Sequence, residues 1–276
     1  MSIEKHFHWI VRSVGERTTK VCTELFQTAG RGESVEIIHI APFVEAVRRT
    51  WQAGRRSGRP WTVCVDADVL VRPERVRELL AVGLASPPSV FSVQGLILDK
   101  LIPTVRPSGV RLYRNAFSVE AQEHIPRVTE HPRPETLTNE RLQQQGYQLA
   151  QTDLVCGLHD FEQDYDDLYR TGFVHAHKHG TLGTPMWENW TRRARHDRDI
   201  AATLLGAQAA AKFSDPLRID LHYGAEYRSM DLKRNGFLPK PFLENITADW
   251  VEKQITRAEI DADLQQLRYP AWSGSF

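Results

Sequence analysis

The sequence predicts an α/β fold in which a mostly parallel sheet is covered by helices on both faces. Strand-like and helix-like segments alternate through the first hundred residues, and the helix-like segments gather their apolar residues on one face. The expected strands are residues 7–14, 35–40, 61–70 and 90–97, and the expected helices are residues 16–27, 43–54 and 73–84. Ligand sites in such sheets lie at the carboxyl ends of the strands.

Composition limits the classes of protein that fit this chain. Of its 276 residues 41% are hydrophobic and 25% charged, which predicts a packed core. Lys+Arg and Asp+Glu both number 35, and this balance argues against a nucleic-acid partner. Three cysteines without CxxC spacing argue against a disulfide framework or a structural zinc site. With no signal-like N-terminus and no long apolar run, we expect a cytoplasmic protein.

The pattern becomes less regular after about residue 100. Residues 159–170 have helical spacing, and residues 173–179 alternate like a strand. Two further helices are expected in residues 186–212 and 248–266. We expect a domain at residues 1–183 and a helical C-terminal extension at 184–276 packed on it.

Two acidic residues lie towards the end of the third expected strand. Asp66 and Asp68 are one residue apart, so both side chains can point the same way on an extended chain. Two carboxylates form a site suited to Mg²⁺ or Mn²⁺, ions that commonly bind substrate phosphates. A strand-end turn with two solvated acids is the alternative.

The first expected strand also ends in polar residues. Arg12 and Ser13 lie at the end of this strand and Glu16 at the start of the helix after it, where side chains and backbone N–H groups can hold a nucleotide. An ordinary strand–helix turn would have the same appearance.

Two further features lie late in the chain. Asp160 begins a helix-like segment and can act as a general base or as an N-cap. His175, His177 and His179 would face one side of an extended segment, and we assign His177 as a third metal ligand. A polar surface strand is the alternative for these histidines.

Taken together, these motifs resemble the GT-A glycosyltransferases, and in particular their family 2-like members. The similarity covers roughly residues 7–180. It includes Val63-Cys-Val-Asp-Ala-Asp-Val-Leu-Val, which looks like the strand and DxD motif of the family, and His159-Asp160 through Phe173, which looks like its acidic-pair segment. His159 stands where the family usually has an acid, which leaves Asp160 or Glu162 as the base.

The resemblance implies a role for each matched residue. Asp68 would bind a Mn²⁺ or Mg²⁺ ion that bridges the donor phosphates, and Asp66 would contact the ribose, or the ion through water. Arg12 and Glu16 would lie near the base of the nucleotide. Asp160 would deprotonate the acceptor hydroxyl in an inverting displacement. Residues 1–100 would form a Rossmann-like nucleotide-sugar-binding half, and residues 101–183 would complete the acceptor and metal sites.

The same resemblance implies the partners. The donor would be a UDP- or GDP-sugar and the acceptor a saccharide or a lipid-linked saccharide, as in the synthesis of surface polysaccharide or glycoconjugates at the inner face of the cell membrane. The segment from Met186 onward carries tryptophans and arginines, among them Trp187, Trp190 and Arg193. It fits a packing or homodimer face better than an acceptor platform or a peripheral membrane contact.

Two other functions fit parts of the pattern. In haloacid-dehalogenase-like phosphohydrolases an apolar strand also leads into Asp-x-Asp, and there Asp66 would be the nucleophile. The motif lies far from the N-terminus here, and no later Gly-Asp-x-x-x-Asp segment follows. The second alternative is a GT-A-like domain that binds a sugar nucleotide without turnover.

Overall fold

The computed structural model describes residues 2–102, 104–128, 130–131, 133–179, 185–211 and 225–260. The strands are β1 Phe7–Ser13, β2 Val35–His39, β3 Trp61–Asp66, β4 Val69–Val71, β5 Val90–Asp99, β6 Thr104–Arg114 and β7 Gln148–His159. The α-helices are α1 Thr19–Ala29, α2 Phe43–Ser57, α3 Pro73–Ala85, α4 Ser118–His124, α5 Pro134–Gln144, α6 Tyr165–His179, α7 Pro185–Arg193, α8 Arg198–Ala210, α9 Ala225–Arg234 and α10 Ala248–Ile260. Within these ranges no helix is both long and apolar enough to cross a bilayer.

The described strands form one seven-stranded sheet in the order β2-β1-β3-β6-β5-β7-β4. β1 runs parallel to β2 and β3, and β5 runs parallel to β7. β6 is antiparallel to β3 and β5, and β4 is antiparallel to β7. The predicted α/β class is confirmed, but the sheet is mixed rather than mostly parallel. The reason is the short turn after β5, which returns β6 as a hairpin partner and not as a crossover strand.

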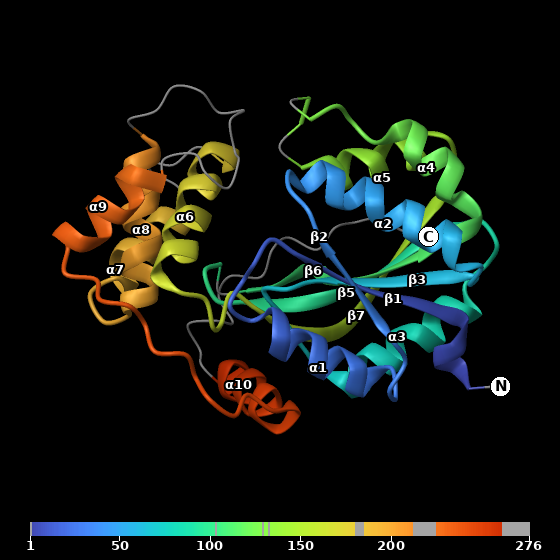
Figure 1. Cartoon of the computed structure of the whole chain (residues 1–276), viewed down its shortest axis with the longest axis horizontal. Helices are drawn as coiled ribbons and strands as arrows, with labels where there is room; N and C mark the ends of the chain where they lie inside the picture. The colour runs from blue at the N-terminus through green and yellow to red at the C-terminus, as the bar shows by residue number, and fades with distance from the viewer. Residues whose placement is uncertain are drawn as a thin grey trace.

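Helices cover both faces of the sheet (Figure 1). α1 and α3 lie on one face, where their apolar residues share a core with the sheet and with α10. α2, α4 and α5 cover the other face around a second core that includes Trp51 and Phe91. Both faces are therefore closed, and the ends of the strands are left to form sites.

A separate helical bundle stands beside the sheet (Figure 1). α6, α7, α8 and α9 share a core that contains Phe173 and Trp190. The backbones of α6 and α8 approach closely where the helices cross at Gly172. A Cβ added there would lie 1.9 Å from the carbonyl oxygen of Thr203. α6 thus packs with helices of the expected extension. The boundary we expected at residues 183 and 184 lies outside the described residues, so this domain division remains a prediction.

The expected strand at residues 173–179 is wrong, because this segment is the second half of α6. The histidines of this segment recur every second residue, which is the period of a strand. The buried residues Leu168, Tyr169, Phe173 and Ala176 instead recur every one to four positions, as on one face of a helix. The helix expected from residue 159 begins only at Tyr165, since β7 continues through His159.

Candidate metal-binding site at the ends of β5 and β7

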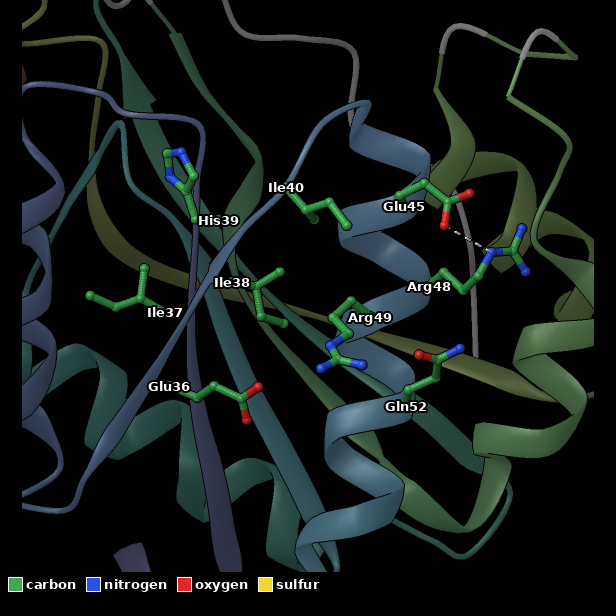
Figure 2. A pocket seen from close by; sticks show the side chains of 9 residues that line it. All are labelled: Glu36, Ile37, Ile38, His39, Ile40, Glu45, Arg48, Arg49 and Gln52. Carbon is green, nitrogen blue, oxygen red and sulfur yellow. Dashed lines mark ion pairs between the residues drawn. The ribbon is translucent and has the colours of Figure 1, made fainter.

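One hollow in the structure lies at the outer edge of the sheet (Figure 2). It has a volume of about 450 Å³ and lies between β2 and the N-terminal half of α2. Three isoleucines line it together with polar side chains, two of which, Glu45 and Arg48, form an ion pair at 3.5 Å. The acidic and histidine residues that could hold a metal lie elsewhere in the sheet.

The stronger candidate site is built where three strand ends meet. In the parallel pair β5–β7, Asp99 is opposite His159, and in the antiparallel pair β4–β7, Val69 is opposite His159. Asp68 precedes β4 and Asp160 follows β7, so this register brings them together, and the Asp160 backbone N–H donates to the carbonyl oxygen of Asp68 at 3.1 Å. Asp160 has φ +61°, a left-handed conformation that turns the chain sharply at the end of β7.

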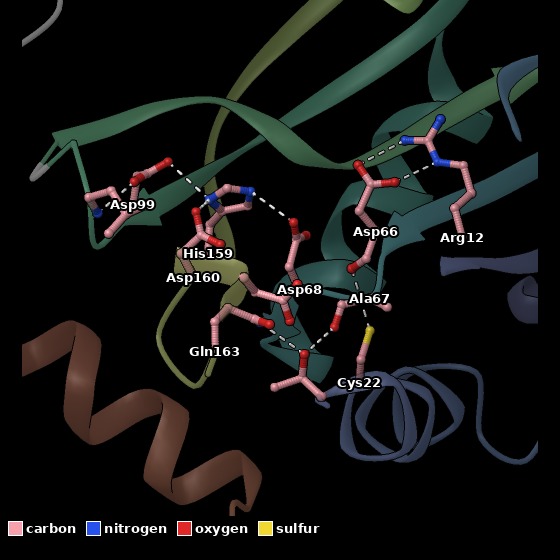
Figure 3. Close-up of polar contacts among 12 residues, drawn as sticks. Arg12, Cys22, Asp66, Ala67, Asp68, Asp99, His159, Asp160 and Gln163 are labelled. Atoms are coloured by element: carbon pink, nitrogen blue, oxygen red, sulfur yellow. Dashed lines mark hydrogen bonds and ion pairs between the residues drawn. The ribbon is translucent and has the colours of Figure 1, made fainter. Parts of the chain in front are cut away.

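Asp68, His159 and Asp160 form a compact group of possible metal ligands (Figure 3). One ligand atom from each lies within 4.8 Å of the others. His159 Nε2 is 3.5 Å from Asp68 Oδ2, and His159 Nδ1 is 3.0 Å from Asp160 Oδ2. We call these three residues the strand-end cluster.

The strand-end cluster fits a divalent cation. Asp68 Oδ1 is buried and has no hydrogen-bond partner among the described residues, and Asp160 Oδ2 faces His159 Nδ1 at 3.0 Å. Leaving such an atom without a partner is costly, and a cation bound between the side chains would remove much of that cost. Two carboxylate oxygens and an imidazole nitrogen suit Mn²⁺, and carboxylate oxygens suit Mg²⁺.

The electrostatics of the cluster also favour a cation. Burial would lower the pKa of His159, but Asp160, Asp68 and Asp99 outweigh it and raise that pKa well above its ordinary value. Burial raises the pKa of Asp160, and the nearby Asp68 and Asp99 raise it further against the effect of His159. Burial also acts to raise the pKa of Asp68, but positive charge, first that of His159, lowers it. Three carboxylates therefore surround one imidazole, two of them, Asp99 and Asp160, buried and Asp68 partly exposed.

Asp66 does not join this cluster, because Arg12 holds it. Arg12 Nε donates to Asp66 Oδ1 at 2.7 Å and Arg12 Nη2 donates to Asp66 Oδ2 at 3.1 Å. Arg12 is opposite Asp66 in the parallel pair β1–β3, which explains the contact. A turn at Ala67 and Asp68 separates β3 from β4, so the two acids point to different neighbours, contrary to our expectation of one common direction (Figure 3). Burial raises the pKa of Asp66 to about 6, against the opposing effect of Arg12.

The other residues expected at the nucleotide close the turn between β1 and α1. Glu16 Oε2 accepts hydrogen bonds from Ser13 Oγ and the Val14 backbone N–H, each at 2.8 Å. Arg12 is almost fully buried, and its Nη1 donates to Glu135 Oε1 at 2.6 Å. Arg12, Ser13 and Glu16 thus shape the carboxyl end of β1, and contact of any of them with a nucleotide remains a prediction.

Glu162, the alternative base, is engaged in other contacts. Its Oε1 accepts a hydrogen bond from the Leu243 backbone N–H at 3.1 Å and lies 3.3 Å from Arg17 Nη2. Glu162 therefore ties the segment before α10 to the start of α1. Asp160, in contrast, lies inside the strand-end cluster.

The histidines expected at the metal lie on α6. The ring of His177 packs against Phe173 with centroids 4.7 Å apart, and the ring of His175 packs against Trp190 at 6.2 Å. Neither is in the strand-end cluster. The metal-ligand role of His177 remains a prediction, and the side chain of His179 lies outside the described residues.

Trp190 serves packing. It is fully buried, and its Nε1 donates to the carbonyl oxygen of Leu101 at 2.6 Å. Arg193 Nη1 donates to the carbonyl oxygen of Lys100 at 3.0 Å. α7 thus holds the turn after β5 through two backbone carbonyl groups.

Sequence reasoning misses two residues of the site. His159 reads in the sequence as a departure from an acidic pair, although it is the centre of the cluster. Asp99 is absent from the expected site. The sequence does contain one signal that could have identified Asp99: it comes closely after the fourth expected strand, just as Asp66 lies near the end of the third.

Comparisons with known proteins give similarity of fold only. No protein-family model matches the chain, and no curated protein matches it either. A glycosyltransferase involved in glycosylation of the major capsid of PBCV-1 is similar to 55% of this chain and 92% of its own, with 14% identity and a TM-score of 0.39. A putative nucleotide-diphospho-sugar transferase from Desulfovibrio desulfuricans G20 covers 72% of this chain and 98% of its own, with 9% identity and a TM-score of 0.38. A cytidylyltransferase from Leptospira borgpetersenii covers 71% of this chain and 96% of its own, with 8% identity and a TM-score of 0.36. Similarity of this size does not identify a substrate or an activity.

Proposed function

We propose that this protein is a metal-dependent glycosyltransferase that moves a sugar from a nucleoside-diphosphate sugar to a hydroxyl acceptor. The observation that carries the proposal is the strand-end cluster, in which two carboxylates and an imidazole converge and Asp68 Oδ1 has no hydrogen-bond partner among the described residues. The cluster lies at the carboxyl ends of β5 and β7, the position at which α/β sheets bind ligands.

In this proposal Asp68 and His159 hold a Mn²⁺ or Mg²⁺ ion. When bound, the ion offsets negative charge that grows on the donor diphosphate as the bond to the sugar breaks. Asp68 supplies an oxygen ligand and His159 a nitrogen ligand. Asp66 bound to Arg12, with Ser13 and Glu16 behind it, supports the wall of the site at which the nucleotide binds.

Asp160 is the proposed general base. The acceptor hydroxyl gives its proton to the Asp160 carboxylate, its oxygen forms a bond to the anomeric carbon, and the bond from that carbon to the diphosphate oxygen breaks. The nucleoside diphosphate leaves with the electron pair. Burial raises the pKa of Asp160, and a carboxylate with a raised pKa is a stronger base. Attack opposite to the leaving group inverts the anomeric centre.

One contact weakens the phosphohydrolase alternative. A nucleophilic aspartate needs a free carboxylate oxygen, whereas both oxygens of Asp66 accept hydrogen bonds from Arg12. The acceptor in our proposal is a saccharide or a lipid-linked saccharide, and contact with a membrane surface or a second copy of the chain remains part of the hypothesis.

Metal-dependent nucleotide binding tests the proposal. Thermal shifts with UDP, GDP and their sugars, each with and without Mn²⁺, should show stabilisation that requires the metal. Asp68→Ala should remove this dependence, whereas Asp153→Ala, at an exposed position on β7, should retain it. Nucleotide affinity that is the same with and without Mn²⁺ in the unsubstituted protein would contradict the assignment. Phosphatase activity on small phosphoesters without nucleotide binding would instead support the phosphohydrolase, and binding without sugar transfer would support the non-catalytic protein.

A further inference from the structure

Asp99 lies behind His159, on the side away from Asp68 (Figure 3). Its carboxylate Oδ2 is 3.0 Å from His159 Nδ1, whereas Asp68 Oδ2 is 3.5 Å from His159 Nε2. Asp160 Oδ2 is also 3.0 Å from Nδ1, so the imidazole has Asp68 at Nε2 and both Asp99 and Asp160 at Nδ1. Asp68 belongs to the proposed cation site, but Asp99 is not one of its ligands.

The position of Asp99 is fixed by several donors. Its Oδ1 accepts the backbone N–H groups of Leu101 and Ile102, each at 2.9 Å. Its Oδ2 accepts Arg106 Nε at 2.9 Å and also Arg106 Nη2. The side chain of Asp99 is 1% exposed. A buried carboxylate with this many donors is held in one orientation and stays an acceptor.

The turn that carries Asp99 is held from outside as well. The Lys100 backbone N–H donates to the carbonyl oxygen of His159 at 3.1 Å, which joins the ends of β5 and β7. Trp190 and Arg193 of α7 donate to the carbonyl oxygens of Leu101 and Lys100. The turn that carries Asp99 is therefore tied both to the end of β7 and to α7 of the helical bundle.

We propose that Asp99 is a positioning residue that keeps the proton of neutral His159 on Nδ1 and so leaves Nε2 free to bind the cation beside Asp68. Ionised Asp99 can only accept, so it favours an imidazole whose N–H faces it. A histidine that binds a metal through one nitrogen commonly donates its other N–H to such a carboxylate. This inference rests on the cation site of the proposed function and adds the residue that orients one of its ligands.

Asp99→Asn tests the role of the carboxylate. If its amide oxygen accepts the backbone N–H groups of Leu101 and Ile102, the introduced asparagine turns its NH₂ towards both Arg106 and His159 Nδ1. A donor facing Nδ1 favours the proton on Nε2, where it blocks the ligand atom. Mn²⁺ binding, followed by the EPR signal of free Mn²⁺ in the absence of donor, should weaken by about 10–100-fold. Asp153→Asn on the same sheet should bind Mn²⁺ as the unsubstituted protein does. In a His159→Ala background, Asp99→Asn should cause no further loss, because Asp99 acts through His159.

A second measurement uses the unsubstituted protein. Long-range ¹H–¹⁵N spectra of ¹⁵N-histidine-labelled protein saturated with Mg²⁺ should show His159 with its proton on Nδ1. A proton on Nε2, or unchanged Mn²⁺ affinity in folded Asp99→Asn, overturns the role of Asp99 alone. Absence of Mn²⁺ binding by the unsubstituted protein overturns the cation site and this inference together.

Discussion

Glu135 offers the sharpest test of the buried charge network beneath Asp66. Its Oε1 accepts Arg12 Nη1 at 2.6 Å and the hydroxyl of Tyr113, and its Oε2 lies 2.9 Å from Arg111 Nη1. Burial alone would raise the pKa of Glu135, but Arg111 and Arg12 outweigh it and lower this pKa from 4.5 to about 2. Glu135→Gln keeps the shape of the side chain and removes the charge between two buried arginines.

The size of the effect follows from linkage. A pKa lowered from 4.5 to about 2 corresponds to about 3 kcal/mol of stability, within the range for breaking a buried ion pair. Because the folded-state pKa is lowered, this stability is fully present above about pH 4.5 and is lost as the pH falls towards 2. Glu135→Gln should therefore cost about 3 kcal/mol at about pH 7, and about 1 kcal/mol less than that at about pH 4.

Urea denaturation at pH 7 and at pH 4 measures both quantities. Glu140→Gln is the matched control, since Glu140 is exposed on the same helix α5 and should change stability little. Thermal denaturation at pH 7 should show a decrease of about 6 °C or more for Glu135→Gln. A loss below about 1 kcal/mol at pH 7, or a loss that is the same at both pH values, would refute the reasoning from linkage.

Three further predictions concern other parts of the molecule. Asp160→Asn should retain metal-dependent donor binding and lose sugar transfer, and full transfer by this variant would place the base elsewhere. Gly172→Ala should destabilise the crossing of α6 and α8 by about 1–3 kcal/mol, because the new Cβ would lie 1.9 Å from the carbonyl oxygen of Thr203; an unchanged urea midpoint would contradict that contact. Arg72→Ala removes the ion pair of Arg72 with Glu252, which joins α10 to the start of α3. Amide hydrogen exchange in α10 should therefore become faster, while exchange in β1 should stay the same.

The first half of the fold could be predicted because its signals are local. The strand and helix segments through α3 match the alternation in the sequence, except that a turn divides the third expected strand into β3 and β4. The amphipathic faces of the helices match the two cores. The hairpin of β5 and β6 was missed, since Pro107 and Gly109 interrupt the apolar pattern of β6. The second half of α6 differs from the strand predicted there, because its histidines alternate as in a strand. Only packing against α8 shows which face of the helix is buried.

The candidate site was predictable in its residue types and less so in its partners. Asp68 and Asp160 were both expected, and the strand pairing brings them together. Their common partner His159 was not assigned, because a histidine beside an aspartate has no distinctive spacing. Asp99 reaches the site because the register of β5 against β7 places it opposite His159. β7 lies far along the chain, and no local pattern in the sequence specifies that register.

The DxD motif itself changes meaning once strand pairing is known. As one continuous strand, residues 61–70 would present Asp66 and Asp68 to a single ion. The turn between β3 and β4 instead moves the chain from the neighbourhood of β1 to the far edge of the sheet beside β7. Asp66 then satisfies Arg12, which leaves Asp68 as the one carboxylate of the motif in the strand-end cluster. In the proposed cation site the second ligand, His159, comes from the strand that β4 meets, and the antiparallel register also places Asp160, the proposed base, beside it.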